Sequence, residues 1–267
     1  GNGHNTAIGS QSQRNATTGE FNTSLGSLSM GSGVTTGDNN VAVGYQSGYD
    51  LTSGTRNTFV GFQSGYEATT DTSNTAIGFR ALKSSKTSNN NVAIGDSALE
   101  ANVDGDGNVA IGYLAMRVFE PANGATNNVA IGNNAGNAMT TGIQNTLIGA
   151  AAGDALTTGS RNIAIGFAAL TVEDTGGRNI AIGRSALSVL DAGQDGYNVA
   201  IGDDAGVSMT GGIKNVLIGG AAGDALTIGQ FNIAIGHRAL STSVDGDNNT
   251  AIGYLALEDY EDGDGDG

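Results

Sequence analysis

Apolar and polar positions along this 267-residue chain follow one short pattern that returns from end to end. Each copy reads Asn, then Thr, Val or Ile, then a residue that is usually Ala, then Ile, Val or Leu, then Gly. The Asn is numbered 0 below, so the Gly lies at +4. Eleven of the fourteen spacings between copies are 17 residues, and the others are 18, 20 and 19. The fifteen copies begin at Asn5, Asn22, Asn40, Asn57, Asn74, Asn91, Asn108, Asn128, Asn145, Asn162, Asn179, Asn198, Asn215, Asn232 and Asn249.

The segment between the Asn and the Gly predicts a strand of about four residues, because it is β-rich and bounded by turn formers. Alternation places +1 and +3 on one face and the small +2 residue on the other. Gly at +4 allows a turn with positive φ or a close backbone approach. A second small-apolar step follows at +7 and +8, as in Ala81-Leu82 and Ala169-Leu170. We therefore expect two short strands in each copy, joined by polar loops.

Position +8 divides the copies into a Leu type and a Gly type. The Gly type carries a residue three places later, at +11, that is apolar, whereas the Leu type is mostly polar there, as at Ser85, Asn102, Glu173 and Ser243. The large apolar residue thus lies at +8 in one type of copy and mostly at +11 in the other. Because most copies keep one, we expect these residues to share a core between stacked coils. The +8 glycines are Gly48, Gly65, Gly136, Gly153, Gly206 and Gly223, followed at +11 by Leu51, Ala68, Met139, Leu156, Met209 and Leu226.

A period of 17 residues with short strands predicts an all-β chain, a parallel β-roll or β-solenoid of about fifteen coils over residues 1–258. Residues 259–267 form an acidic Asp/Gly tail or linker. The repeated Asn predicts a side-chain ladder at one corner. Each coil holds few large apolar side chains, so we expect the small face at +2 and +7 to be buried between identical chains, most simply in a homotrimeric rod.

Composition and charge narrow the class of protein. The chain has 45 Gly, one Pro and no Cys or Trp, and its formal net charge is −15. Binding to nucleic acid or to an anionic membrane needs clustered Lys and Arg, so neither is expected. No thiolate metal site or disulfide can form without Cys. No apolar run approaches the ~18 residues of a membrane span, so no membrane insertion is expected, and no signal peptide is visible.

The unit "NNVAIG" (127–132), with "SNTAIGFRAL" (73–82) and "RNIAIGFAAL" (161–170), resembles the head repeat of YadA-like trimeric autotransporter adhesins and related repeats of tailed-phage tail fibres. The resemblance covers residues 1–258, although the 17-residue period is longer than the adhesin unit. It implies a left-handed β-roll built by three chains, located outside the cell and attaching to a host-surface glycan or protein receptor. The longer unit and the acidic charge favour a viral tail fibre, and a cell-surface adhesin head is the alternative.

Catalytic motifs are weak, and no enzyme activity or cofactor is expected. The "GDSAL" stretch at 95–99 resembles a lipase motif, yet Ser97 lies at a variable position and the chain has only His4 and His237 as candidate bases. "GSGVTTG" at 31–37 has the glycines of a phosphate loop without its Lys. A β-helical polysaccharide depolymerase remains a lesser alternative, because it needs paired carboxylates whereas the acids here are scattered over turns.

Acidic turns offer the one candidate metal chemistry. Alternating Asp and Gly can present carboxylates and carbonyls to Ca²⁺, although tight turns use the same residues without a metal. A calcium-binding solenoid therefore stays an alternative to solvated turns, and an ice-binding one is disfavoured because Thr drifts between +12 and +13. The Asp residues concerned are Asp104, Asp106, Asp245, Asp247 and Asp262–Asp266.

The last expectations concern residues at the surface of the coils. Aromatic residues recur at +5 and +9, and we favour packing between chains for them over stacking on sugar rings. His237 at +5 is expected on the surface. The aromatic residues are Tyr45, Phe62, Phe79, Tyr113, Phe167 and Tyr254 at +5, with Tyr49 and Tyr66 at +9.

Asn15 and Asn22 match glycosylation sequons, and the ladder position of Asn22 argues against glycosylation there. The insert at 117–126, which holds the sole Pro, is expected to form a surface loop. A second bulge is expected at 191–197.

Overall fold

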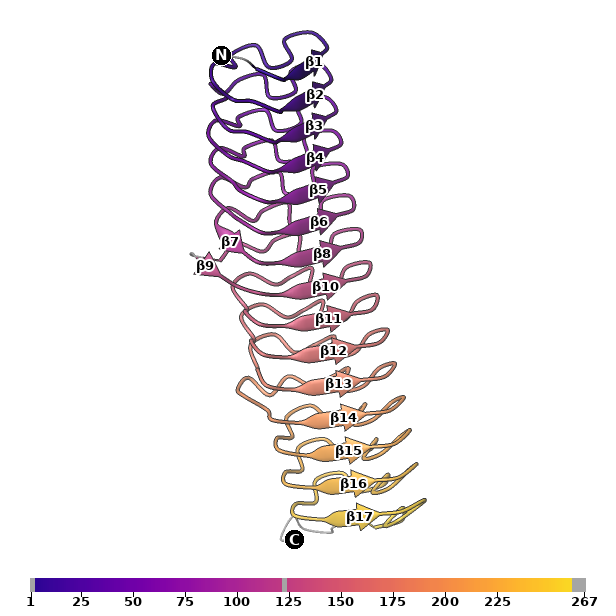
Figure 1. Cartoon of the computed structure of the whole chain (residues 1–267). Helices are drawn as coiled ribbons and strands as arrows, with labels where there is room; N and C mark the ends of the chain where they lie inside the picture. Colours follow the sequence, from indigo (N-terminus) through magenta and orange to yellow (C-terminus); the bar gives the residue numbers. More distant parts are fainter. Residues whose placement is uncertain (1–2, 122–123, 261–267) are drawn as a thin grey trace. The chain divides into compact units, whose positions relative to one another are not determined.

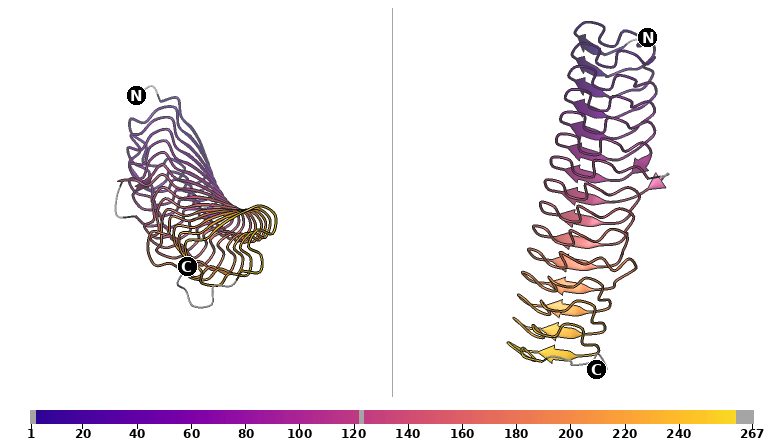
Figure 2. Two further views of the ribbon diagram at one scale, coloured as in Figure 1. Left: turned by 90° about the horizontal axis from the view of Figure 1, so that it is seen from below. Right: turned by 180° about the vertical axis from the view of Figure 1, so that it is seen from behind.

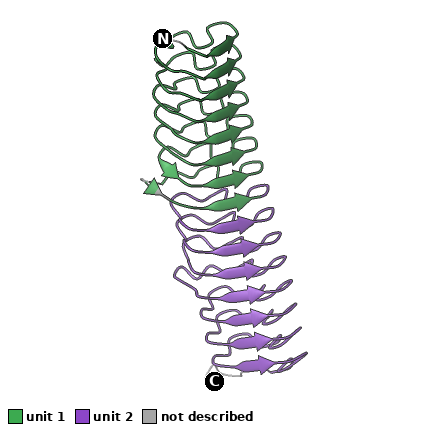
Figure 3. Cartoon of the chain, viewed as in Figure 1, with its two compact units in different colours: residues 1–131 green, residues 132–267 purple. Residues whose placement is uncertain are grey.

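The computed structural model describes residues 3–121 and 124–260, and within them the chain is all-β. It forms two compact units, residues 1–131 and 132–267, each a parallel β-solenoid (Figure 3). In both units every copy of the repeat supplies one coil with one strand of the main sheet. The predicted fold class is therefore confirmed.

In the first unit, consecutive coils pair in parallel (Figure 1). They pair in register, so that Ala93 lies between Ala76 and Ala110. The register survives the 20-residue coil, since Val129 still pairs with Val109. A second, two-stranded sheet pairs β7 (Gly105–Asp106) with β9 (Gly124–Ala125). The main strands are β1 (Thr6–Ile8), β2 (Thr23–Leu25), β3 (Val41–Val43), β4 (Thr58–Val60), β5 (Thr75–Ile77), β6 (Val92–Ile94), β8 (Val109–Ile111) and β10 (Val129–Ile131).

The second unit repeats this arrangement in seven strands, and the view from behind in Figure 2 shows their common direction. Its 19-residue coil likewise keeps the register, since Ile180 pairs with Val199. The strands are β11 (Thr146–Ile148), β12 (Ile163–Ile165), β13 (Ile180–Ile182), β14 (Val199–Ile201), β15 (Val216–Ile218), β16 (Ile233–Ile235) and β17 (Thr250–Ile252).

The expected second strand of each coil, at +7 and +8, is wrong. In all fifteen coils positions +6 and +8 have φ between 46° and 59°, as at Arg80 (52°) and Leu82 (52°), and two left-handed residues make a turn instead of an extended segment. A leucine in this conformation is costly by about 1 kcal/mol or more. The fully buried side chain of Leu82 offsets that cost.

The small residues at +2 and +7 lie inside each coil, so the expectation that a second chain buries them is wrong. Ala164 at +2 and Ala169 at +7 are both 0% exposed in the single chain. The sequence argument for a homotrimer through this face therefore fails, while the residues at +1 and +3 point outward.

The glycines at +8 have a packing reason that the sequence analysis missed. A Cβ on Gly65 would lie 2.7 Å from the ring of Phe59, which stands at +2 where most coils have Ala. A Cβ on Gly153 would similarly lie 2.9 Å from Leu147. The Gly-type coils thus exchange a large residue at +8 for a large one at +2 or +11, and interior volume is conserved.

Position +11 stays inside the coil in both types. Ser85, Asn102, Glu173 and Ser243 are all 0% exposed. Asn102 Oδ1 accepts from the Gly105 N–H at 3.1 Å, and Glu173 Oε1 accepts from the Gly176 N–H at 2.7 Å. Asn102 and Glu173 therefore stabilise the buried turn that follows each of them by satisfying its backbone.

The asparagine ladder is confirmed, with backbone as well as side chains in it. Asn162 donates its backbone N–H to Asn145 Oδ1 at 2.9 Å, and its Nδ2 donates to the Gly176 carbonyl at 2.9 Å. Direct amide-to-amide bonds occur in some coils, as from Asn57 Nδ2 to Asn40 Oδ1 at 3.1 Å. Each Asn thus fastens its own corner to both neighbouring coils.

Gly at +4 is required by conformation and by space. Its φ lies between 128° and 142° in every coil, a region that side chains disfavour. A Cβ on Gly26 would also lie 2.5 Å from the carbonyl oxygen of Gly44 in the next coil. Both predicted reasons for this glycine therefore apply together.

Candidate functional site

The described residues, 3–121 and 124–260, enclose no pocket of ligand size. Ser97 is only 6% exposed, and its Oγ donates to the carboxylate of the adjacent Asp96 at 2.8 Å. Within the same ranges, no histidine contacts Ser97, so the arrangement lacks the base that a serine nucleophile needs.

The glycine-rich stretch at 31–37 does not present free amides. The N–H groups of Thr36 and Gly37 both donate to the Thr52 carbonyl of the next coil, at 2.8 and 3.1 Å. Thr35 is fully buried. A phosphate cradle needs backbone N–H groups directed at the ligand, and here the stacking of coils occupies them.

The acidic turns hold neighbouring coils together. Asp106 Oδ1 accepts from the Asn89 N–H at 2.6 Å, and Asp247 Oδ1 accepts from the Gln230 N–H at 2.6 Å. Asp104 accepts from the Thr87 hydroxyl, whereas Asp245 is exposed. Outside the uncertain residues 122–123 and the ends, no three His, Asp or Glu side chains gather as metal ligands. Asp262–Asp266 lie outside the described residues.

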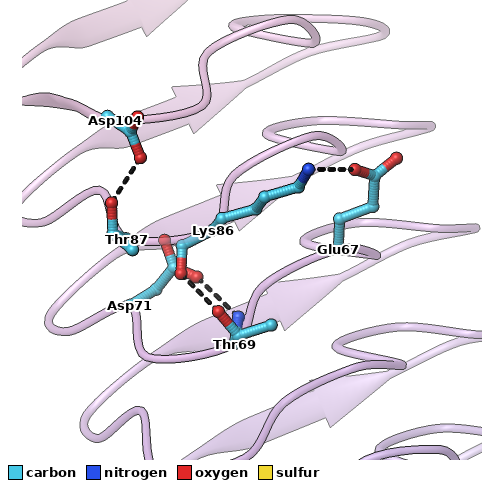
Figure 4. A network of polar contacts seen from close by, with 6 residues as sticks. All are labelled: Glu67, Thr69, Asp71, Lys86, Thr87 and Asp104. Atoms are coloured by element: carbon cyan, nitrogen blue, oxygen red, sulfur yellow. Dashed lines mark hydrogen bonds and ion pairs between the residues drawn. The ribbon is translucent and has the colours of Figure 1, made fainter. Parts of the chain in front are cut away.

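One buried carboxyl group stands out among these turns. Asp71 is 0% exposed and replaces the glycine that most coils carry three residues before the ladder Asn. Its carboxylate accepts from the Thr69 N–H at 3.0 Å (Figure 4). It also accepts from the Ser85 hydroxyl. Burial raises its pKa to about 6, and these hydrogen bonds oppose the rise. The nearby ion pair of Lys86 with Glu67 involves other side chains (Figure 4).

A second buried acid lies in the other unit. Burial also raises the pKa of Glu173, against the N–H donors of Gly176 and Ala192. On the surface of the same unit, hydrogen bonds from Arg184 to Asp203 and Asp204 raise the pKa of that guanidinium. These acids act on backbone or on cations of their own chain, which is a structural use of carboxylates.

A regular apolar surface lies on the outward strand face, defined here as positions +1 and +3 of the strands. In most strands these residues are partly exposed on either side of a buried +2, as in β12 and β13. The Ile163 and Ile165 side chains of β12 pair in register with Ile180 and Ile182 of β13. Each unit thus presents a continuous stripe of β-branched side chains, which exceeds the scattered surface hydrophobes of monomers.

The aromatic residues at +5 border this face just beyond the Gly turn. Tyr45 stacks on Phe62 at 5.6 Å between ring centroids, and Phe62 on Phe79 at 5.2 Å. Tyr49 and Tyr66 at +9 stack at 5.1 Å. Stacking between coils covers the ring faces and leaves the edges outward, so sugar stacking on faces is hindered within these rows. Tyr113, Phe167 and Tyr254 are 51%, 61% and 75% exposed.

The remaining expectations concern loops. The insert is anchored, because Phe119 is 0% exposed and Pro121 is buried, so a surface loop is wrong for its first half. The predicted bulge at 191–197 is mostly exposed. His237 is exposed and stacks on Tyr254 at 5.8 Å. The sequon residue Asn15 donates Nδ2 to the Ser32 carbonyl at 2.9 Å.

Sequon residue Asn22 is 1% exposed in the ladder, as its position suggested.

Sequence reasoning missed one exposed row, which is made of the residue immediately before each ladder Asn. In the second unit this row stacks cations on rings, with Arg178 at 5.2 Å from the centre of Tyr197 and Lys214 at 4.9 Å from that of Phe231. The 17-residue register marks these positions in the sequence as well.

Comparison of the chain with protein-family models, with curated proteins and with solved structures gives no match. The described residues include no helix that is long and apolar enough to cross a membrane.

Proposed function

We propose that this chain is a structural and adhesive fibre segment, part of a viral tail fibre or a similar extracellular appendage that attaches to a host surface. Its copies associate through the outward strand face into a homotrimer. The observation that carries the proposal is the continuous Val and Ile stripe that each unit leaves partly exposed. A cell-surface trimeric adhesin head is the alternative within the same class.

The outward strand face has the character of an interface. In the second unit, twelve of the fourteen residues at +1 and +3 are Ile or Val, and the other two are Thr. None is charged, although the chain has 37 Lys, Arg, Asp and Glu residues in total (11 + 26). Depletion of charge with apolar side chains in register is typical of obligate interfaces between copies. Three such flat faces close around an axis without leaving one exposed.

The interiors of the coils support a structural role over catalysis. Several polar groups inside them bond to backbone, as Asn102 and Glu173 do, and the outside offers regular stacked rows in place of a concave site. The stacked coils of each unit are suited to presenting a regular receptor-binding surface, whereas enzymes need a pocket.

The direct test is the solution mass of the full chain by light scattering, with and without EDTA. We expect a mass near three chains that EDTA leaves unchanged. Ile165→Lys with Ile182→Lys should give a folded monomer, since both side chains are outward. The matched control, Thr158→Lys with Thr175→Lys, adds the same charge on exposed loops of the same unit and should stay trimeric.

A monomeric wild-type chain would overturn association through this face. Loss of assembly in EDTA would instead make the acidic turns calcium sites. Expression on a cell surface through a native anchor, in place of incorporation in a virion, would decide for the adhesin alternative.

A further inference from the structure

A second exposed feature lies at the corner before each strand. We define the pre-asparagine column as the residues directly preceding the ladder Asn in the second unit. All of them have φ between 52° and 62°, so the same left-handed corner carries each side chain. Five of the seven are cationic or aromatic. The members are Gln144, Arg161, Arg178, Tyr197, Lys214, Phe231 and Asn248.

The backbone does not favour these residues. Asn and Gly are the types that adopt the left-handed region at least cost. The first unit follows that rule at four left-handed corners, Asn39, Asn90, Gly107 and Asn127, and departs from it at Phe21, Arg56 and Ser73. The second unit keeps the conformation but places large side chains in it at six consecutive corners. A repeated departure from the low-cost residue is a reason to look for a function.

Burial does not explain the departure either. Arg161, Tyr197, Lys214 and Phe231 are exposed, in contrast to the left-handed leucines at +8, which fill the core. Their contacts run along the surface from coil to coil. Arg161 Nε donates to the side chain of Gln144 at 3.1 Å.

The column concentrates positive charge on a chain that is acidic overall. Three of the five cations of the second unit lie in it. Arg178 is paired with Asp195 at 2.7 Å. In the ranges 3–121 and 124–260, neither Arg161 nor Lys214 makes an ion pair with the protein. Their charges are therefore available to an anion from outside.

We propose that the pre-asparagine column binds a linear acidic polysaccharide, with carboxylate or sulfate groups on Arg161 and Lys214 and sugar rings against the exposed side chains of Tyr197 and Phe231. Arg178, paired with Asp195, lies over the Tyr197 ring between these contacts. Parallel strands of neighbouring coils lie about 4.8 Å apart, close to the length of one sugar in an extended chain. One sugar per coil thus keeps the polymer in register with the column. A guanidinium or a ring also offers a sugar both charge and apolar contact.

This inference names a receptor class for the proposed attachment function and rests on it in that respect. Nucleic acid carries anionic groups and rings too. It is disfavoured because the chain has a net charge of −15 and no broad basic surface, and affinity for phosphate backbones needs many cations.

The experiment uses the full chain and a fluorescent polygalacturonate oligomer, with a neutral amylose oligomer of equal length as the first control. Binding is followed by anisotropy at physiological salt. We expect polygalacturonate to bind and amylose not to bind. Arg161→Asn, Arg178→Asn and Lys214→Asn together should weaken binding at least tenfold. Tyr197→Asn with Phe231→Asn should weaken it severalfold without any change in charge.

A matched triple variant removes three cations elsewhere, Lys83→Asn, Arg184→Asn and Arg238→Asn, and should bind like wild type. Melting temperature separates binding from stability. Asn suits the left-handed corner, so the column variants should melt at or above the wild-type temperature.

Three results would overturn the inference. These are no polygalacturonate binding by wild type, equal losses in both triple variants, or equally tight binding of polyuridylate. Column variants that melt lower and bind unchanged would assign the side chains to stability alone. The trimer mass is measured on the same samples, so failure of association and failure of binding are read separately.

Discussion

The packing between Phe59 and Gly65 gives the most decisive prediction for the fold. Phe59→Ala removes a fully buried ring, and Gly65→Leu adds a side chain where that ring lies. Together they recreate the Leu-type coil that follows, which has Ala76 at +2 and Leu82 at +8. The left-handed backbone is no obstacle, since φ is 57° at Gly65 and 52° at Leu82.

The expected costs follow from the contacts. Phe59→Ala alone should lower the free energy of unfolding by about 3–5 kcal/mol, as for other buried rings. Gly65→Leu alone should cost about 2–4 kcal/mol, because its Cβ would lie 2.7 Å from the ring. The double variant should cost only about 1–2 kcal/mol, since the new leucine refills the cavity, except beside Gly48. The favourable coupling is therefore at least about 3 kcal/mol.

The assay is urea unfolding followed by far-UV circular dichroism, because the chain has no Trp for fluorescence. Denaturant slopes must agree among the four proteins before free energies are compared, since repeat arrays can unfold in parts. Tyr113→Ala, at a ring that is 51% exposed, is the control and should change stability by no more than about 0.5 kcal/mol. Additive costs in the double variant would refute the exchange of volume between +2 and +8.

Three further predictions concern the ladder, the buried acid and the turn glycine. Asn162→Asp keeps the acceptor but loses the Nδ2 bond to Gly176, and thermal melts should show a loss of about 1–3 kcal/mol. The raised pKa of Asp71, about 6 against 3.8, means that the folded state holds this proton more tightly. Stability from this group is therefore greatest at low pH and is lost as pH rises from about 4 to 6. Unfolding titrations of Asp71→Asn should lack that fall, and an unchanged fall would assign it to other acids. Gly166→Ala meets both a φ of 137° and the Gly183 carbonyl, so it should cost more than about 3 kcal/mol, and a neutral effect in urea would contradict the close approach.

Most of the fold was predictable because the same short pattern, with the same local conformational preferences, occurs fifteen times in the chain. The spacing of Asn and Gly fixed the coil length, the parallel register and the ladder. The exchange of apolar residues between +8 and +11 was readable as well. Its third partner at +2, the ring of Phe59 or the side chain of Leu147, was equally visible in the sequence but needed the contact to give it meaning.

Where sequence reasoning failed, geometry between coils was the cause. Left-handed residues at +6 and +8 turned an expected strand into a corner, and a single sequence carries no mark of φ when Leu or Arg occupies such a position. Polar side chains such as Glu173 look solvent-facing by type, yet they are buried because they satisfy their own turn.

For this protein, the sequence by itself determined the period, the positions of the main strands and the repeated Asn and Gly corners, since these depend on local propensity and on exact repetition. Only the tertiary structure decided which face of the strand is inside. Alternation defines two faces without saying which is buried, and the answer depends on how the left-handed turn at +6 and +8 folds the rest of the coil back. The small side chains are the ones buried, as at Ala164 and Ala169, so the small face is the core and the Val and Ile face stays partly exposed.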